Sequence, residues 1–253
     1  MKKMLLILAI CAALGVPTIH AQKKPGWTLT FDDEFKGKAL DLTKWNTEDP
    51  WGHERNQELQ AYVTNAFTVR HGILRVEAKR ASAFYSGKER YFTSGMMTTY
   101  GKFSQQYGWF EIRCRVPKGK GMWPAFWLLP EPLGWPPEID ILEILGREPN
   151  KIYMTQHFYD DHDKHKSDGG SWTGPDFSGN FHVFAIDWSP DGVDWYVDGI
   201  KRFHSNKYVP HKKMYMLVNL AIGGEWAGAP DEKTVFPGTF EVDYVRVYAK
   251  SDK

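Results

Sequence analysis

Short runs with the character of β-strands follow one another along most of this chain. Each run alternates apolar and polar residues, or is rich in β-branched and aromatic residues, and turn residues separate it from the next. Successive side chains of a strand point to opposite faces, so this pattern predicts strands, and no long stretch has the 3.6-residue period of a helix. The predicted strands are residues 28–31, 67–70, 73–79, 92–99, 108–116, 123–129, 138–144, 152–158, 182–188, 192–197, 200–204, 214–221 and 239–249.

Strands that follow one another so closely favour an all-β sandwich or barrel. Two of the connections, His71-Gly72 and Asp198-Gly199, have the composition of two-residue hairpin turns. Residues 159–180 form the longest stretch without a strand or helix pattern and are expected to be a functional or mobile loop. A chain of 253 residues without internal repeats or a low-complexity linker is expected to form one domain.

The N-terminus has the pattern of a secretory signal peptide. Two lysines precede an apolar run at residues 4–16, and the small residue Ala21 follows it. The run is shorter than the roughly 20 residues that span a bilayer, which disfavours a membrane anchor. We therefore expect residues 1–21 to be removed and residues 22–253 to be exported to the periplasm, the cell surface or the medium.

A lipid anchor through Cys11 is the minor alternative for the N-terminus. Lipoprotein leaders carry a small residue before the modified cysteine, whereas the bulky Ile10 stands there in this chain. Cleavage without lipidation is therefore the favoured expectation.

Composition restricts the class of ligand. The chain carries 11 Trp, 12 Tyr and 15 Phe at a mean hydropathy of −0.50, so it is polar and yet rich in flat rings. Its formal net charge is +1, which supplies no field for a phosphate backbone and argues against a nucleic-acid partner. Sugars, which present flat apolar faces between hydroxyl groups, are the ligands that fit this composition.

Three acidic residues lie close together in one predicted strand. Glu138 and Asp140 share a face, about 6.6 Å apart along a regular strand. Glu143 has the opposite parity and would point into the core, where an unpaired charge is costly. One extra residue near 141–142, a β-bulge, would return it to the face of the other two acids.

Such a cluster suits acid–base chemistry better than a structural role. Mutual repulsion separates the pKa values of neighbouring carboxyl groups, so that one is ionised while another is protonated. Retaining glycosidases use two carboxyl groups about 5–5.5 Å apart in this way. The alternative, a solvated strand edge, fits poorly because the intervening residues Ile139, Ile141 and Leu142 predict a buried opposite face.

Tryptophans surround the acidic strand in sequence. Trp123 and Trp127 are four residues apart in the preceding strand and so share one face. Indole rings stack on the C–H faces of sugars, which favours these two as cleft residues. Trp109, Trp135 and Trp226 could extend the same surface.

With its other motifs, the acidic segment resembles glycoside hydrolase family 16. Glu138-Ile139-Asp140-Ile141-Leu142-Glu143 is similar to the bulged Glu-x-Asp-x-x-Glu motif of that family. The resemblance implies a β-jelly-roll sandwich of two antiparallel sheets with a concave substrate cleft, and endo-acting hydrolysis with retention. It further implies that Glu138 is the nucleophile, Asp140 the assisting acid and Glu143 the general acid/base. The other matching segments are Phe31-Asp32-Asp33-Glu34-Phe35, Asn56-Gln57-Glu58-Leu59-Gln60, Tyr107-Gly108-Trp109-Phe110-Glu111, Trp123-Pro124-Ala125-Phe126-Trp127 and Val242-Asp243-Tyr244-Val245-Arg246-Val247-Tyr248.

The resemblance also implies ligand contacts. Trp123 and Trp127 match cleft aromatics, and Asn56, His157 and Trp226 match substrate-contacting positions. From the residues alone, His157 could equally be a structural histidine.

A metal site is implied as well. Many members carry a structural calcium, for which Asp243 and the backbone oxygens around Glu34 and Gly72 would be the ligands. Catalysis itself is expected to need no cofactor.

We therefore expect a secreted, monomeric, endo-acting retaining β-glycosidase acting on a β-linked glycan, with β-1,3- or mixed-linkage glucan slightly favoured. Leu142 and Pro137 stand where laminarinase-type members usually carry Met and Gly, so an endo-β-1,4-galactosidase acting on keratan, mucin-type poly-N-acetyllactosamine or agar-like chains is the alternative. A transglycosylase would share the covalent intermediate. A non-catalytic carbohydrate-binding sandwich is the alternative from another class.

Overall fold

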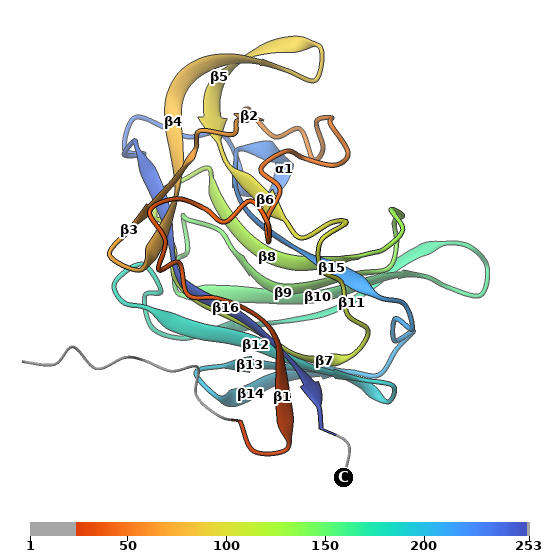
Figure 1. The fold of residues 1–253 in the computed structure, drawn as a ribbon. Helices are drawn as coiled ribbons and strands as arrows, with labels where there is room; N and C mark the ends of the chain where they lie inside the picture. The colour runs from red at the N-terminus through yellow and green to blue at the C-terminus, as the bar shows by residue number, and fades with distance from the viewer. Residues whose placement is uncertain (1–23, 252–253) are drawn as a thin grey trace, which may run out of the picture.

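The computed structural model describes residues 24–251, which form two β-sheets packed face to face (Figure 1). The all-β sandwich expected from the strand pattern is confirmed. The expected signal peptide, residues 1–21 with Cys11, lies outside the described residues. Within residues 24–251, no helix has the length and apolar character that crossing a membrane requires.

The larger sheet has ten strands, and its strand order brings distant parts of the sequence together. Strands β1 and β16, from the two ends of the chain, pair antiparallel along its middle. The order is β14 (Ile200–Ser205), β13 (Gly192–Val197), β12 (His182–Ser189), β7 (Gly108–Arg115), β16 (Gly238–Lys250), β4 (Ile73–Tyr85), β5 (Lys88–Ser94) and β2 (Gln60–Tyr62), with β1 (Trp27–Asp33) on β16 and β3 (Phe67–Arg70) on β4.

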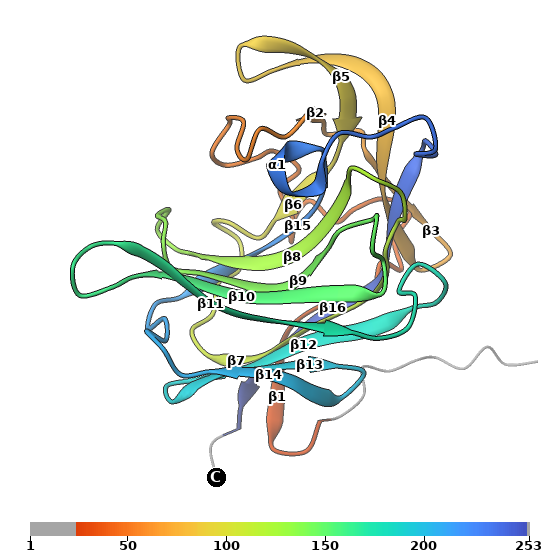
Figure 2. The ribbon, with the colours of Figure 1, turned by 180° about the vertical axis from the view of Figure 1, so that it is seen from behind.

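The smaller sheet has six strands and carries the acidic segment at its centre. Its strands β8, β9 and β10 are curved in both ribbon views (Figures 1 and 2). The order is β11 (His165–Thr173), β10 (Lys151–Tyr159), β9 (Glu138–Ile144), β8 (Met122–Pro130), β15 (Met214–Ile222) and β6 (Met96–Thr98). Every pairing between the described strands is antiparallel except that of β2 with β5. One short helix, α1 (Gly224–Ala227), follows β15.

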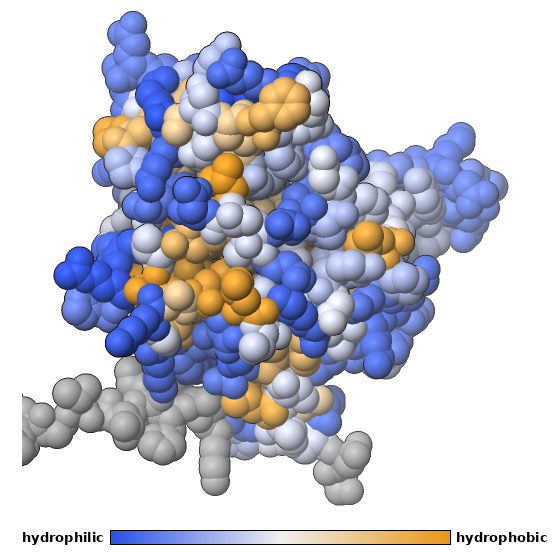
Figure 3. Space-filling view, turned by 45° about the horizontal axis from the view of Figure 1, so that its top comes forward, coloured by the Kyte–Doolittle hydropathy of each residue, from blue (hydrophilic) through white to orange (hydrophobic). Residues whose placement is uncertain are grey.

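The inner faces of the two sheets form one hydrophobic core. Alternate residues of β7, such as Phe110 and Ile112, are fully buried and belong to the same cluster as Ile139 and Ile144 of β9. Burying each such side chain contributes about 1.5–3 kcal/mol, so this core fixes which face of β9 turns outward. On the face seen in Figure 3, exposed hydrophobic residues form separate patches between hydrophilic ones.

Both predicted hairpin turns are confirmed, and one predicted strand is divided. Val197 pairs with Ile200, and Arg70 pairs with Ile73, across turns in which both central residues have positive φ. The predicted strand 92–99 breaks at Gly95 into β5 and β6, which belong to different sheets. A Cβ at Gly95 would lie 2.8 Å from side-chain atoms of Phe67 and Val76, so only glycine permits this close crossing.

The expectation of a long loop at 159–180 is wrong, because β11 lies within it. This strand pairs with β10 alone and forms the edge of the smaller sheet. Apart from Trp172 its residues are polar or glycine, and it buries no continuous apolar face, so the sequence lacks the alternation that identifies a strand. The pairing with β10 supplies the backbone hydrogen bonds that hold β11 in place.

Candidate active site

A β-bulge in β9 brings the three acids to one face of the smaller sheet. Asp140 and Leu142 pair with consecutive residues of β8, and Ile141 is the extra residue between them. The register against β10 shifts at the same place. The bulge expected near 141–142 is therefore confirmed, and it reverses the parity of Glu143 relative to the strand before it.

All three acids line one cleft of about 660 Å³. The cleft crosses the smaller sheet from Met96 in β6 to His165 in β11, and so touches every strand of that sheet. Both aromatic and polar side chains line it, which is the combination that sugar binding requires. Its lining residues are Trp51, His53, Arg55, Asn56, Glu58, Tyr62, Met96, Trp123, Ala125, Trp127, Leu129, Trp135, Glu138, Asp140, Glu143, Thr155, His157, His165, Asn219, Ala221, Glu225 and Trp226.

Glu138 has two neighbours that favour its ionised form. Trp135 Nε1 donates a hydrogen bond to Oε2 over 2.8 Å, and His157 Nε2 lies 3.8 Å from Oε1. Burial raises the pKa of Glu138 well above its ordinary value, and the charge of Asp140 raises it further. The His157 charge and the Trp135 hydrogen bond oppose this rise.

Asp140 is the most deeply buried of the three acids, with 2% of its surface exposed. Trp195 of the larger sheet holds its backbone by donating from Nε1 to the Asp140 carbonyl oxygen over 2.8 Å. Burial raises the pKa of Asp140 to about 7, and a hydrogen bond with Glu138 opposes the rise. Its Oδ2 accepts no hydrogen bond and lies 3.3 Å from His157 Nε2. The protonation of Asp140 and that of Glu138 are therefore linked.

Glu143 is the acid with the weakest support for a negative charge. Burial raises its pKa well above the ordinary value, and the charges of Asp140 and Glu138 raise it further. The hydrogen bond from Trp123 Nε1 to Oε1, 3.0 Å long, opposes the rise. A carboxyl group in this environment holds its proton more tightly than a free glutamate, which suits a proton donor.

The cleft aromatics are held by specific contacts. Trp123 packs edge-on against Trp226, with ring centroids 5.2 Å apart, and Trp226 packs against Tyr153 at 4.8 Å. Trp123, Trp127, Asn56, His157 and Trp226 all line the cleft, where the sequence analysis placed them. Their individual contacts to substrate stay predictions.

The expectation that Trp109 extends this surface is wrong. Trp109 lies on β7 of the larger sheet and is only 9% exposed. Its ring packs against Trp27 and Tyr196, with centroids 6.2 and 4.8 Å away, and its Nε1 donates to Glu111. The alternation of a strand shows which residues share a face, but not which of two sheets that strand will join.

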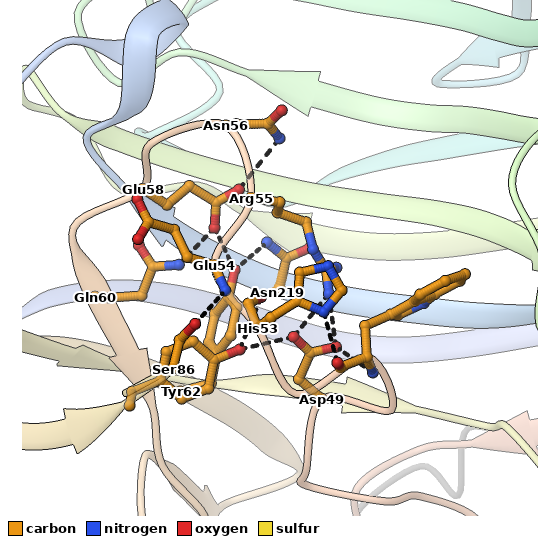
Figure 4. Close-up of polar contacts among 12 residues, drawn as sticks. Asp49, His53, Glu54, Arg55, Asn56, Glu58, Gln60, Tyr62, Ser86 and Asn219 are labelled. Carbon is orange, nitrogen blue, oxygen red and sulfur yellow. Dashed lines mark hydrogen bonds and ion pairs between the residues drawn. The ribbon is translucent and has the colours of Figure 1, made fainter. Parts of the chain in front are cut away.

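A buried ion pair anchors the segment that forms one wall of the cleft (Figure 4). Arg55 Nη2 lies 2.7 Å from both carboxylate oxygens of Asp49, and the Tyr85 hydroxyl donates to Asp49 over 2.7 Å. The Asp49 side chain is 1% exposed. Asp49 and Arg55 were not predicted from the sequence, because their segment has no strand or helix period and the two residues meet only when it folds back on itself.

Glu58 organises the polar side of the same wall. It accepts hydrogen bonds from Gln60 Nε2 at 2.6 Å, from the Tyr62 hydroxyl at 3.3 Å and from Asn56 Nδ2 at 3.3 Å (Figure 4). Burial raises the pKa of Glu58, and these hydrogen bonds oppose the rise. The motif Asn56-Gln57-Glu58-Leu59-Gln60 was the signal in the sequence for this cluster.

The same hydrogen bonds continue to a cleft tryptophan. Asn219 Nδ2 donates to the Tyr62 hydroxyl over 3.0 Å, and Trp127 Nε1 donates to Asn219 Oδ1 over 2.7 Å. The orientation of the Trp127 ring is therefore fixed by groups from β2 and β15 as well as by its own strand.

His165 is a further cleft residue that sequence reasoning missed. Its Nε2 lies 3.0 Å from His157 Nδ1, and the two rings are stacked with centroids 5.2 Å apart. Burial and the neighbouring His157 lower the pKa of His165. It lies on β11, the strand that the sequence did not reveal.

Two groups of residues bear on metal binding. Among the described residues, ligand atoms of Glu138, Asp140 and His157 lie within 4.8 Å of one another and could hold a metal ion, although these atoms are the ones needed for acid–base chemistry. At the expected calcium site, a Cβ on Gly72 would lie 4.0 Å from the Glu34 carbonyl oxygen, and Asp243 Oδ2 is paired with Arg113.

Arg113 donates to Oδ2 of Asp243, which leaves Oδ1 as an oxygen of the kind that calcium prefers. The structural calcium at Asp243, Glu34 and Gly72 stays a prediction.

Known proteins resemble this chain over most of its length. The family model "Glycosyl hydrolases family 16" matches residues 44–246. A beta-glucanase of Rhodothermus marinus is 36% identical over 97% of this chain and 92% of its own length. The endo-1,3-1,4-beta-glycanase EglC of Rhizobium meliloti is 39% identical over 88% of this chain, which spans about half of that relative (52%).

A solved structure agrees with these matches. The laminarinase catalytic domain of Thermotoga maritima superposes with a TM-score of 0.80 at 36% identity, over 89% of this chain and 99% of that domain. The jelly-roll sandwich is thereby confirmed, and with it the type of enzyme. The chain is a glycoside hydrolase and belongs to glycosyl hydrolases family 16.

Proposed function

We propose that this protein is an endo-acting β-glucan hydrolase that cleaves with retention of anomeric configuration. The names of the relatives, a beta-glucanase, an endo-1,3-1,4-beta-glycanase and a laminarinase, support a β-1,3- or mixed-linkage glucan as the substrate. The predicted leader supports export, so that the enzyme would meet the polymer outside the cytoplasm.

The observation that carries the proposal is the bulge at Ile141, which places Glu138 and Glu143 in one cleft with Asp140 between them. The neighbours of the two glutamates assign their roles. Glu138, with an indole donor and a histidine beside it, is the better nucleophile, whereas Glu143, whose pKa is raised by burial and by the two neighbouring acids, is the better acid.

In the first step, Glu138 attacks the anomeric carbon while Glu143 transfers its proton to the leaving oxygen. This step forms a glycosyl ester on Glu138 and breaks the glycosidic bond. Glu143, now ionised, removes a proton from water, and the water oxygen displaces Glu138 from the anomeric carbon. Asp140 exchanges its proton with Glu138 as the charge on that carboxyl group changes.

The shape of the cleft supports attack on internal bonds. It crosses all six strands of the smaller sheet, so a chain can lie across β9 with sugar units on both sides of the acids. Trp123 and Trp127 offer flat apolar surfaces beside the acids, while the exposed Asn56 offers an amide group for hydroxyls.

A product assay tests the activity and the substrate together. Laminarin, lichenan, agarose, carrageenan and poly-N-acetyllactosamine would be incubated with the protein and with Glu138→Gln as the inactive control. We expect laminarin and lichenan to give oligosaccharides of mixed length with new reducing ends. NMR spectra recorded during the reaction should show the β-anomer of these reducing ends before the α-anomer appears. If the protein cleaves agarose or poly-N-acetyllactosamine but neither glucan, the substrate is a galactose-containing glycan instead. Products longer than the starting chains would identify a transglycosylase, and binding without cleavage would identify a carbohydrate-binding protein.

Rescue with azide separates the roles of the two glutamates. With an aryl oligosaccharide that has a good leaving group, Glu138→Gly is expected to give the α-glycosyl azide, because azide replaces the nucleophile in a single displacement. Glu143→Gly is expected to give the β-glycosyl azide, because azide attacks the glycosyl-enzyme. The opposite pair of products would reverse the assignment.

A further inference from the structure

A second hollow lies beside the catalytic cleft, where several connections between strands meet. It has a volume of about 570 Å³. Pro136 comes from the segment before β9, Tyr159 from the end of β10, Asp191 from the β12–β13 turn, and Asn206 and Tyr208 from the segment between β14 and β15. We call this hollow, defined by these five residues and His211, the lip groove.

The lip groove presents two exposed aromatic rings. Tyr159 is 48% exposed and Tyr208 is 45% exposed. The Tyr208 ring is stacked on the buried Phe158, with centroids 4.6 Å apart and an angle of 14° between the ring planes. Because Phe158 covers one face, the exposed part of Tyr208 is a flat apolar surface that is held in one orientation.

Polar groups accompany these rings. Asp191, Asn206 and His211 are exposed and line the same hollow. The hydroxyl of Tyr107 lies 2.6 Å from His211 Nδ1, so this contact holds the imidazole at the edge of the hollow. Flat rings with a carboxylate, an amide and an imidazole around them form the combination that binds sugar rings and their hydroxyls.

An aromatic contact joins the lip groove to the catalytic cleft. Trp135 lines the cleft and donates to Glu138, and its ring packs edge-on against Tyr159, with centroids 6.4 Å apart. Tyr159 lines the lip groove, and Pro136, the residue after Trp135, does so as well. A chain that leaves the cleft past Trp135 therefore meets Tyr159 next.

We propose that the lip groove binds a further stretch of the β-linked glycan whose backbone is cleaved in the cleft. The inference rests on the proposed function, since the same polymer must occupy both sites. A long chain held at the groove raises the effective concentration of its own bonds at the acids, while a short oligosaccharide occupies the cleft alone. The lip groove thus favours polymer over short products.

Binding and turnover of long and short substrates test the inference. Laminarin is the long probe and laminaritetraose the short one, and Glu138→Gln provides an inactive background for binding. In that background, Tyr208→Ala is expected to weaken laminarin binding about 3- to 10-fold, the loss typical of one aromatic contact. In the active protein, turnover of laminaritetraose by Tyr208→Ala is expected to stay within a factor of two of the wild-type value.

The controls separate loss of the ring from loss of the fold. Tyr208→Phe keeps the ring and should retain laminarin binding, and Tyr91→Ala removes a tyrosine that is 68% exposed on β5, outside both sites, and should change nothing. Should the melting temperature show that Tyr208→Ala does not fold, Asn206→Ala takes its place, with a laminarin-specific loss again expected.

Unchanged laminarin affinity, or equal losses with laminarin and laminaritetraose, would overturn the lip groove as a glycan site. The failure of the proposed function has a different signature, because the wild-type protein would then release no reducing ends from laminarin at all.

Discussion

The indole nitrogen of Trp135 lies 2.8 Å from Oε2 of Glu138 and donates a hydrogen bond to it. The donor comes from the segment just before β9, so the residue that lines the cleft at its lip also stabilises the ionised form of the proposed nucleophile.

Replacing Trp135 by phenylalanine would keep a ring but remove this donor. A hydrogen bond to a charged group is worth about 1.5–3 kcal/mol, so we expect kcat/KM on laminarin to fall roughly 10- to 100-fold. Without the donor the pKa of Glu138 rises, and since the nucleophile must be ionised, the acid limb of the pH–rate profile should move to higher pH. The control Trp27→Phe changes a tryptophan outside the cleft and should leave the pH–rate profile unchanged. A Trp135→Phe profile identical to that of the wild-type protein would contradict the role of the hydrogen bond.

Deleting Ile141 would remove the bulge and restore a regular strand. The strand would then read Glu-Ile-Asp-Leu-Glu, so Glu143 would stay on the face of Glu138 and Asp140, while the buried side chain of Ile141 would be lost. We expect a lower melting temperature, because the core loses one buried side chain, and retained turnover of laminarin, because all three acids still face the cleft. The control Ile141→Val keeps the residue count and should stay active, with a loss of about 1 kcal/mol in the free energy of unfolding. A deletion variant that folds but does not turn over laminarin would show that the bulge does more than set the parity of Glu143.

The pKa of Asp140 makes stability depend on pH. Its folded value of about 7 lies above the ordinary value of 3.8, so the folded state holds this proton more tightly than the unfolded state. The free energy of unfolding therefore falls as the pH rises from about 4 to about 7, and this loss is absent below pH 4. At roughly 1.4 kcal/mol per pKa unit, the effect is at most about 4 kcal/mol.

Urea denaturation between pH 4 and pH 8 measures this dependence. Asp140→Asn cannot ionise, so its stability should rise relative to the wild-type protein as the pH increases through this window. Asp163→Asn makes the same change of charge at an exposed position and should show no such trend. A difference between Asp140→Asn and wild type that does not vary with pH would contradict the raised pKa.

The ion pair between the buried Asp49 carboxylate and the half-buried Arg55 should stabilise the fold more than the ion pairs at the surface. Asp49→Asn leaves the half-buried Arg55 charge without its partner, so we expect a loss of about 3 kcal/mol in the free energy of unfolding. Activity on laminarin should fall too, because the segment carries Asn56 and Glu58 into the cleft. Glu77→Gln, which breaks the exposed pair with Lys79, should cost less than 1 kcal/mol. Equal losses in the two variants would contradict the anchoring role of Asp49.

The sequence by itself determined those features that depend on neighbouring residues. Alternation identified most of the strands, and the turn residues at His71-Gly72 and Asp198-Gly199 identified two hairpins. The wrong parity of Glu143 sufficed to predict the bulge, because burying an unpaired charge costs more than inserting one residue into a strand. These arguments are local, so a single sequence contains what they need.

Only the tertiary structure decided which strands meet and therefore which side chains share the cleft. Trp109 has the same alternation as Trp123, yet β7 joins the larger sheet and carries Trp109 to the opposite side of the molecule. His165 reaches His157 through β11, an edge strand with no apolar face to reveal it. Such contacts follow from pairing between distant segments, and the free energy of that pairing comes from the whole core rather than from the residues that it brings together.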